Sequence, residues 1–477
     1  MSDTSLKSLV ILMGGSFLLA LLFFAQPGYL ASPRTLGGII VVQIVLAAVC
    51  KYKQVFFVVL MATFLWAGTD LPLRNAWLQG RWFLLGIGAL AGLAIYMKDR
   101  NHHFSTFHLI AFFCVLSAMV SALVSAYPEE AALKGLSLLL LFVYGASGSR
   151  IAVPVLRPEK FFRGLLLGCE VLTYFTAFSY FLLRWEIYGS PNSLGAVMGV
   201  AVVPVMLWGL LTAQTVLERR RRAFGLVLAM LVLMSSFSRA GIVAGAVSFL
   251  LMCVAQRQYR LIAKGISAAV VLAVVAVMFV PKPNEAPKWD GSESVTSMFL
   301  YKGKPQKGFL GSRIGVWDQT WSVIKDNPWF GSGFGTSVIG DDPTRFTFGG
   351  SHVDSRVMRE HGNSYLEIAE WVGLLGVVPF YFLIALTTLN VGKVFSWLRR
   401  TGNVFSPAVP AAAILAAGLV DAAFEDWLFA VGYYLCAFFW ALAFILVDLM
   451  PSSIVVCPAD DVSLIYEGQF TAVASGQ

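Results

Sequence analysis

Charged residues are scarce in this chain of 477 residues: they make up 13% of it, whereas hydrophobic residues make up 58%. A soluble domain carries about one quarter charged residues. Too little polar surface is therefore present to cover a water-soluble globule. The mean hydropathy is +0.74 and the apolar runs are long and repeated, so the composition predicts a membrane protein.

Paired cysteines are also lacking. Six cysteines are present, and no two of them form a Cys-x-x-Cys pair. Five lie in or at the edge of apolar runs and one lies in the C-terminal tail, so neither a disulfide framework nor a zinc site is expected. Walker, Rossmann and kinase motifs are missing from the sequence as well. We therefore expect no cofactor.

Basic residues exceed acidic residues, which gives a formal net charge of +8. In a soluble protein this excess would suggest a nucleic-acid partner. Here the basic clusters are short and lie between apolar runs, so loops that face an anionic membrane leaflet explain them better. We expect membrane lipid as a partner and no nucleic acid.

Fourteen apolar segments predict an all-α polytopic membrane protein with about fourteen transmembrane helices. The turns within 36–68 and 223–256 are so tight that either pair could be a single element. We interpret the first segment as a retained helix, because it is long for a signal peptide and lacks a clear cleavage site. The segments are 8–25, 36–50, 54–68, 82–97, 105–126, 135–149, 162–183, 193–213, 223–237, 238–256, 263–281, 371–392, 405–422 and 427–448.

Lysine and arginine positions predict the orientation of these helices. With the N-terminus in the cytoplasm, the cytoplasmic loops hold nineteen of these residues and the short outer loops hold six. The asymmetry follows the positive-inside rule. The predicted organisation is transmembrane helices 1–11 in 1–281, a large periplasmic helical loop domain in 282–370, transmembrane helices 12–14 in 371–448 and a cytoplasmic tail in 449–477.

The long outer segment carries helix signals of its own. Ile314, Trp317, Trp321 and Ile324 recur three to four residues apart, which predicts one apolar stripe of an amphipathic helix. The proline within 326–328 should end that helix, because proline cannot continue the hydrogen-bond ladder. A glycine-rich turn follows, and it is weak support for phosphate binding.

The next stretch of the outer segment carries a possible basic surface. If 351–361 is helical, His352, Arg356 and Arg359 share one face. The alternative is a solvated helix face paired with the acidic residues Asp354 and Glu360.

A helix start is predicted at the end of the outer segment. Ser364-Tyr-Leu-Glu367 has the pattern of a capping box that opens the twelfth span. His361 and Asn363 come just before it. Because a helix start presents free N–H groups and a positive dipole end, we expect these residues at a natural anion site.

Five stretches together resemble the O-antigen ligase and Wzy-type polymerase superfamily. They are Ser190-Pro-Asn-Ser-Leu-Gly195, Ser238-Arg-Ala-Gly241, Gly311-Ser-Arg-Ile-Gly-Val-Trp317, Asn327-Pro-Trp-Phe-Gly-Ser-Gly-Phe-Gly335 and Asn363-Ser-Tyr-Leu-Glu-Ile-Ala-Glu-Trp-Val-Gly-Leu-Leu-Gly376. The resemblance extends over about 180–450. It departs in one place, since the family has histidine directly before the residue aligned with Asn363. Here that residue is Gly362, and the histidine is His361, with His352 as the substitute candidate.

The resemblance implies a glycosyltransferase in the bacterial inner membrane with a periplasmic active site. Its donor would be a glycan linked to a polyprenyl diphosphate, and its acceptor a growing glycan or the lipid A core. We favour an exopolysaccharide or O-antigen polymerase. O-antigen ligase is the alternative, and a chain-length regulator or flippase is a possible partner. A transporter or flippase is the second alternative, although no internal repeat is visible and charges are nearly absent from span centres.

Under this resemblance, Arg239 and Arg313 clamp the leaving diphosphate and His361 accepts the acceptor proton. The simpler alternatives are an interface arginine, a helix-surface arginine stacked on Trp317, and a histidine that only caps its helix. Glu367 is expected to serve the capping box. No acidic cluster with metal-ligand spacing appears in the outer segment, so no metal is expected. The predicted substrate-binding residues are Asn192, Trp317, His352, Arg356, Arg359, Asn363, Glu425 and Asp426.

Overall fold

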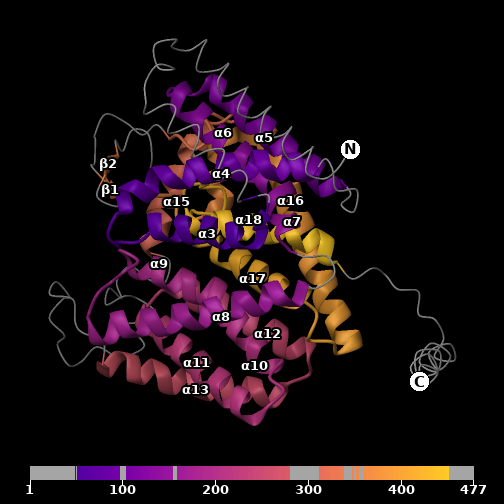
Figure 1. Cartoon of the computed structure of the whole chain (residues 1–477). Helices are drawn as coiled ribbons and strands as arrows, with labels where there is room; N and C mark the ends of the chain where they lie inside the picture. Colours follow the sequence, from indigo (N-terminus) through magenta and orange to yellow (C-terminus); the bar gives the residue numbers. More distant parts are fainter. Residues whose placement is uncertain are drawn as a thin grey trace, which may run out of the picture.

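The computed structural model describes residue 49 and residues 51–96, 104–153, 158–279, 311–337, 346–348, 351–353 and 359–450. Helices make up most of this part of the chain (Figure 1). The predicted segment 8–25, and nearly all of 36–50 and of the tail 449–477, lie outside the described residues.

The described helices follow the apolar pattern of the sequence, and three of them pass without a break into π-helical segments. They are α3 (Lys53–Ala67), α4 (Arg74–Tyr96), α5 (Thr106–Val124), α6 (Pro128–Tyr144) with η2 (Gly145–Ser149) and α7 (Arg150–Ala152), α8 (Pro158–Ala177) with η3 (Phe178–Leu182), α9 (Pro191–Ala196) with η4 (Val197–Val202) and α10 (Val203–Leu211), α11 (Val216–Ser235), α12 (Arg239–Ala255), α13 (Tyr259–Phe279), α15 (Gly311–Asp326), α16 (Ser364–Thr401), α17 (Ala408–Asp421) and α18 (Tyr434–Leu449).

Each predicted apolar segment from 54–68 onward overlaps one of these helices. The split within 223–256 is also confirmed. α11 ends at Ser235, and the side chain of Ser238 caps the start of α12 by accepting a hydrogen bond from the Gly241 backbone N–H.

Six of the described helical stretches are long and apolar enough to cross a membrane, judged by length and composition. They are Arg74–Tyr96, Thr106–Val124, Pro128–Ala152, Pro158–Leu182, Pro191–Leu211 and Ser364–Thr401. Shorter apolar helices are Lys53–Ala67, Arg239–Ala255, Ala408–Asp421 and Tyr434–Leu449. The helical membrane fold is therefore confirmed, whereas the count of fourteen spans, their sidedness and the division into domains stay predictions.

Two of the shorter apolar helices form the centre of the molecule. α17 and α18 lie in the middle of the described helices (Figure 1), and nearly all of their residues are buried. A helix that is apolar all round is stable where other helices cover every face. The segment between α17 and α18 is therefore held by a packed core at both ends.

The backbones of α9, η4 and α12 approach each other closely at glycines. A Cβ added to Gly199 would lie 2.0 Å from the Gly241 carbonyl oxygen, and one on Gly241 would lie 2.3 Å from that of Gly195. Small residues permit such crossings in membrane helices. The start of α9 is thus fixed beside the start of α12, where Arg239 is the first helical residue.

α16 is interrupted at Gly373, where φ is +67°. The segment at 328–333 supplies hydrogen bonds to the backbone groups around the break. These bonds run from Ser332 N to Glu370 O (2.9 Å), Gly333 N to Trp371 O (3.1 Å), Leu374 N to Pro328 O (2.8 Å) and Leu375 N to Trp329 O (3.2 Å). The glycine-rich turn therefore has a structural role, because its backbone groups bind the helix.

The helix that 351–361 would need for a basic stripe is not formed at its described residues. β1 (Phe346–Phe348) and β2 (Ser351–Val353) pair as an antiparallel hairpin, with His352 opposite Thr347. Arg359 lies in irregular backbone before α16, and Arg356 lies outside the described residues. His352 and Arg359 therefore do not share a helix face, because His352 lies in a strand that pairs with 346–348.

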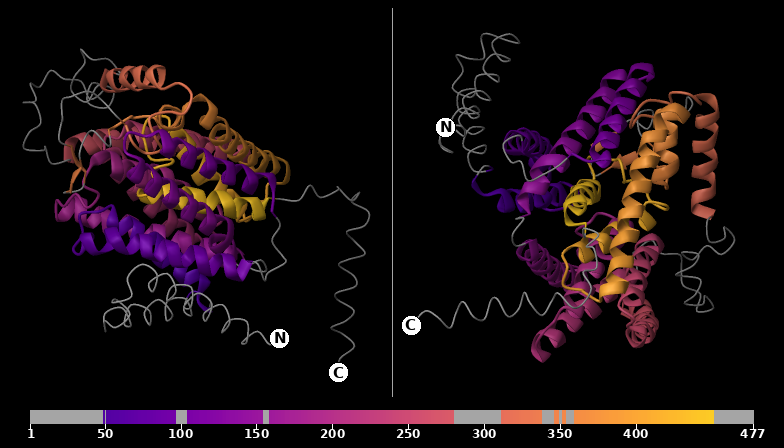
Figure 2. Two further views of the ribbon diagram at one scale, coloured as in Figure 1. Left: turned by 90° about the horizontal axis from the view of Figure 1, so that it is seen from above. Right: turned by 90° about the vertical axis from the view of Figure 1, so that its right-hand side faces the viewer.

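α15 begins and ends near the predicted residues, and it packs against α16 (Figure 2). Its buried face is rotated from the predicted apolar stripe. Ile314 and Trp321 are 51% and 53% exposed, whereas Thr320, Val323 and Ile324 are buried. The hydroxyl of the buried Thr320 accepts a hydrogen bond from Arg359 (2.9 Å). Periodicity does not reveal this contact.

Candidate functional site

The start of α16 is capped by Asn363. Its side-chain oxygen accepts hydrogen bonds from the backbone N–H groups of Tyr365 (2.9 Å) and Leu366 (3.1 Å). The predicted capping box from Ser364 to Glu367 is therefore wrong, since the helix begins at Ser364, one residue earlier than that box requires. Asn363 was predicted to bind substrate, but its side chain caps the start of α16.

The Ser364 hydroxyl connects this helix start to the segment between α17 and α18. It donates to the Glu425 carbonyl (2.7 Å) and accepts from the N–H groups of Trp427 (2.9 Å) and Leu428 (3.0 Å). Its own N–H donates to the carbonyl oxygens of Ala422 and Glu425. These bonds place Glu425 and Asp426 beside the residues that precede α16.

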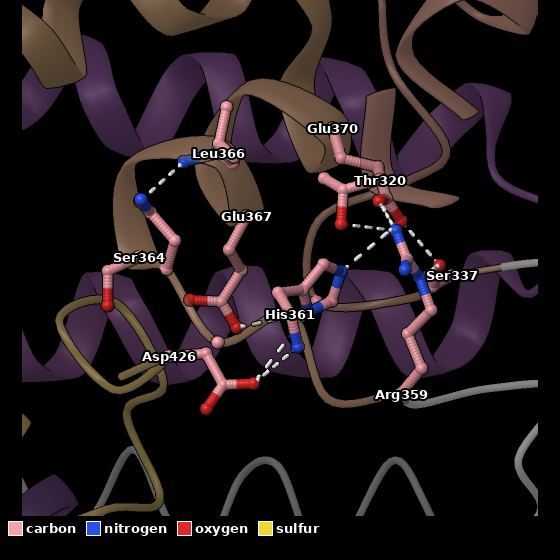
Figure 3. Close-up of polar contacts among 12 residues, drawn as sticks. Thr320, Ser337, Arg359, His361, Ser364, Leu366, Glu367, Glu370 and Asp426 are labelled. Atoms are coloured by element: carbon pink, nitrogen blue, oxygen red, sulfur yellow. Dashed lines mark hydrogen bonds and ion pairs between the residues drawn. The ribbon is translucent and has the colours of Figure 1, made fainter. Parts of the chain in front are cut away.

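His361 lies at the centre of the polar cluster in Figure 3 and is only 1% exposed. Its backbone N–H donates to Asp426 Oδ2 (2.7 Å). Its ring Nδ1 lies 3.7 Å from Glu367 Oε1 and 3.9 Å from Asp426 Oδ2, and its Nε2 lies 3.3 Å from Glu370 Oε1. The ring packs edge-on against Trp371. One imidazole thus faces three carboxylates.

Arg359 supports this cluster from one side. Its guanidinium forms a close ion pair with Glu370, and it donates to Ser337 Oγ and Thr320 Oγ1, each at 2.9 Å (Figure 3). The Ser337 hydroxyl in turn donates to Glu370. Since the side chain of Arg359 is only 7% exposed, it neutralises Glu370 and is not the surface residue that the sequence suggested.

Arg313, on α15, connects the outer part of the site. Its Nη1 lies 2.8 Å from Glu360 Oε1, and its Nη2 lies 2.6 Å from Glu425 Oε1. Its guanidinium also lies against Gly362, where an added Cβ would come within 2.4 Å of Nη1. Trp317, also on α15, donates from Nε1 to the Gly362 carbonyl (3.2 Å). The glycine before Asn363 therefore makes room for an arginine.

Burial controls the charge of Glu425. It raises the pKa of this carboxyl group from 4.5 to about 8, although the nearby guanidinium of Arg313 acts in the opposite direction. The neighbouring carboxylates of Asp421 and Asp426 raise it further. Arg313 thus lies between an exposed Glu360 and a buried Glu425 whose proton is retained near neutral pH.

Partial burial, and after it the charge of Arg313, lower the pKa of Arg239, so the two guanidinium groups lie within electrostatic reach of each other. Asn192 is the second residue of α9, and Gly195 of the same helix packs against Ser238, the cap of α12. The starts of α9 and α12 are thus neighbours. The structure therefore brings the regions of Asn192, Arg239, Arg313 and His361 to one end of the helix bundle.

Three site residues were missed by sequence reasoning. Glu367, which was assigned to a capping box, and Glu370 both turn their carboxylates toward His361. Their spacing of three residues on one helix face was the available signal. Lys134 on α6 donates to the Gly335 carbonyl, and its charge acts on Glu367. No local pattern marks that lysine. Of the predicted residues, His352 is described only as part of β2, and Arg356 is not described.

The apolar helices and this buried polar cluster define a multi-pass membrane protein with a site built from helix ends. Residues 224–381 match the family model described as O-antigen ligase. The match confirms the resemblance to the O-antigen ligase and Wzy-type polymerase superfamily, and it includes Arg239, Arg313 and His361. A comparison with curated proteins finds none that matches the chain.

Proposed function

We propose that this protein is a membrane glycosyltransferase that moves a glycan from a polyprenyl diphosphate to a sugar hydroxyl, and that it acts as an exopolysaccharide or O-antigen polymerase. The observation that carries the proposal is the convergence of Arg239, Arg313 and His361. These residues come from α12, α15 and the segment before α16, and Arg313 lies against Gly362, next to His361. The family match supports the same class of reaction.

Arg239 and Arg313 can bind the diphosphate leaving group. In the reaction, the acceptor hydroxyl oxygen bonds to the anomeric carbon, and the bond between that carbon and the diphosphate oxygen breaks. The diphosphate leaves with the electron pair and gains negative charge. A guanidinium remains charged and binds phosphate oxygens through two N–H groups. Arg313 already directs Nη1 at the carboxyl group of Glu360 and Nη2 at that of Glu425, and a diphosphate would compete with them for the same donors.

The cluster around His361 can accept the proton that the reaction releases. The acceptor hydroxyl has to lose this proton as its oxygen attacks the anomeric carbon. His361 is enclosed, but the side chain of Asp426 is 23% exposed, and its Oδ2 lies 3.9 Å from His361 Nδ1. We propose that Asp426 meets the acceptor at the surface and that the proton passes to the pair of Asp426 and His361.

An apolar groove supports a lipid-linked donor. A cavity of about 630 Å³ lies between α5 and α16, and its lining includes Ser121, Val372 and Phe382. The Ser121 hydroxyl donates to the Trp371 carbonyl, and the Trp371 ring packs on His361. A donor with an apolar tail and a charged head matches this change from apolar to polar surroundings.

The experiment that tests the proposal is the glycan profile of the native host without this protein. Lipid-linked saccharides and surface polysaccharide are resolved by size. Accumulated single repeat units without polymer support a polymerase. Lipid-linked polymer that fails to reach the lipid A core would instead indicate a ligase. An unchanged profile contradicts both and favours a transporter.

A further inference from the structure

The two ring nitrogens of His361 have unequal surroundings (Figure 3). Nε2 lies 3.3 Å from Glu370 Oε1, whereas Nδ1 lies 3.7 Å from Glu367 Oε1 and 3.9 Å from Asp426 Oδ2. Neither nitrogen makes a well-aligned hydrogen bond within the described part of the chain. Hydrogen bonds of catalytic groups are often long or poorly aligned before the substrate binds. A small turn of the ring would let Nε2 donate to Glu370, which would leave Nδ1 as the acceptor.

Glu370 is held as an ionised hydrogen-bond acceptor. Its Oε2 forms a close ion pair with the guanidinium of Arg359, and its Oε1 accepts a hydrogen bond from the Ser337 hydroxyl. Its side chain is 0% exposed, and a buried charge is stable where it is paired and hydrogen-bonded. One lone pair of Oε1 remains for a further donor. A ring nitrogen that faces this oxygen is therefore favoured as N–H, because a bare lone pair would be repelled.

Glu367, on the other side of the ring, offers no comparable acceptor. Its Oε2 has no hydrogen-bond partner among the described residues. Within the same part of the chain, the only basic side chain that lies within ion-pair distance of it is His361. No arginine or hydroxyl there fixes its charge, as Arg359 and Ser337 do for Glu370. Glu370 is thus the carboxylate that decides which ring nitrogen carries the proton.

We propose that Glu370 is a positioning residue for glycan transfer, which holds the proton of neutral His361 on Nε2 and leaves Nδ1 to accept the substrate proton. This inference rests on the proposed function. In the reaction, the proton of the acceptor hydroxyl passes by way of Asp426 to Nδ1, and the Nε2 proton stays between the ring and Glu370. Glu370 remains ionised and stabilises the imidazolium that forms. A buried carboxylate holds the histidine of serine proteases in one tautomer in the same manner.

Distant segments keep Glu370 and the ring in place. The backbone carbonyl of Glu370 accepts a hydrogen bond from the N–H of Ser332 (2.9 Å). Arg359, which pairs with its carboxylate, also donates to Thr320 Oγ1 on α15 (2.9 Å). The ring of Trp371 packs edge-on against His361. A positioning role requires a carboxylate whose own orientation is fixed in this way.

Replacing Glu370 with glutamine should change the pH dependence of transfer in one direction. The variant removes a negative charge beside Nε2, so the imidazolium becomes less favourable and the acid limb of the rate profile moves to lower pH by about 1 unit or more. The other charges around the ring stay unchanged. They are carried by Glu367 on α16, Asp426 between α17 and α18, Arg359 before α16, Lys134 on α6 and Arg313 on α15.

The first test measures initial rates of polymer formation from pH 5 to pH 9. It uses membranes of the native host, which contain the donor, with each variant as the only copy of the protein. Glu370→Gln should lower the rate by about 10²- to 10⁴-fold and shift the acid limb. Glu370→Asp keeps the charge and should restore the wild-type limb. Asp326→Asn, at an exposed carboxylate on the last residue of α15, is the control and should change neither.

The second test reads the tautomer directly, without activity. The full-length protein is labelled with ¹⁵N-histidine and studied in detergent by NMR. The chain has five histidines, so comparison with His361→Ala identifies the signals of His361. We expect the proton of neutral His361 on Nε2, and Glu370→Gln should populate the form with the proton on Nδ1.

Two results would overturn the positioning role of Glu370. One is a wild-type His361 with its proton on Nδ1, and the other is a Glu370→Gln variant with the wild-type tautomer and acid limb. If Glu370→Gln does not fold, the wild-type tautomer and the acid limb of Glu370→Asp decide. A wild-type protein that holds the proton on Nε2 but forms no polymer would refute the glycosyltransferase and not the contact between Glu370 and His361.

Discussion

Arg313 Nη2 on α15 lies 2.6 Å from Glu425 Oε1 in the segment between α17 and α18, although the two residues are 112 positions apart in the chain. The pair connects the amphipathic helix of the long segment to the most deeply buried part of the bundle. Because Glu425 retains a proton near neutral pH and Glu360 is exposed, the guanidinium can exchange these partners for a phosphate.

Replacing Arg313 should therefore abolish transfer. For Arg313→Ala we expect a loss of about 100- to 1000-fold, as for other groups that stabilise developing negative charge. Arg313→Lys should be nearly as poor, because an ammonium lacks the two-pronged donor geometry. The measurement is the length and amount of glycan made by membranes with equal protein. Lys325→Ala, at the other end of α15, is the control, and a normal product from Arg313→Ala would refute the clamp.

Stability should fall as pH rises across the titration of Glu425. Its pKa is raised to about 8 from 4.5. Between these values the unfolded chain loses the proton while the folded protein keeps it, so the folded state loses stability with rising pH until about pH 8. We expect a flatter dependence of melting temperature on pH for Glu425→Gln. Glu360→Gln should keep the wild-type slope, and identical slopes for Glu425→Gln and wild type would contradict the assignment.

Gly373→Ala should destabilise the protein by about 1–3 kcal/mol or more. Its φ of +67° is unfavourable for alanine, and the new Cβ would lie 2.5 Å from the Gly331 backbone nitrogen. Gly392→Ala in the same helix is the matched control, because a Cβ there meets nothing within 4 Å. That change should be neutral or slightly stabilising. The measurement is the thermal unfolding of both variants in the same detergent. Equal stabilities of the two variants would be evidence against the break described in α16.

Gly362→Ala should reduce activity more than stability. The new Cβ would come within 2.4 Å of Arg313 Nη1 and displace the guanidinium. Gly402→Ala has a similar positive φ at the end of α16, with nothing within 4 Å. Both variants should lose about 1 kcal/mol of stability from backbone strain. Only Gly362→Ala should lose transfer, so comparable activity in the two variants would show that Gly362 does not position Arg313.

Hydropathy located nearly every described helix, because a long apolar run has few stable arrangements other than a helix in an apolar environment. Two features escaped it. The 351–353 segment is a strand because it pairs with 346–348, and its charge pattern gave no sign of that pairing. Thr320 is bound by Arg359, 39 positions away, which lies outside the window over which a periodicity is read.

The sequence by itself determined a helical membrane protein and the superfamily it resembles, and it nominated Arg239, Arg313 and His361 as candidate site residues. The tertiary structure alone decided what these residues meet. Glu367, Glu370 and Asp426 surround His361 because α16 and the α17–α18 segment are tied together by the Ser364 hydroxyl. The reason is physical: helix formation follows from local composition and hydropathy, whereas the charge state and partners of a buried group depend on atoms from distant parts of the chain.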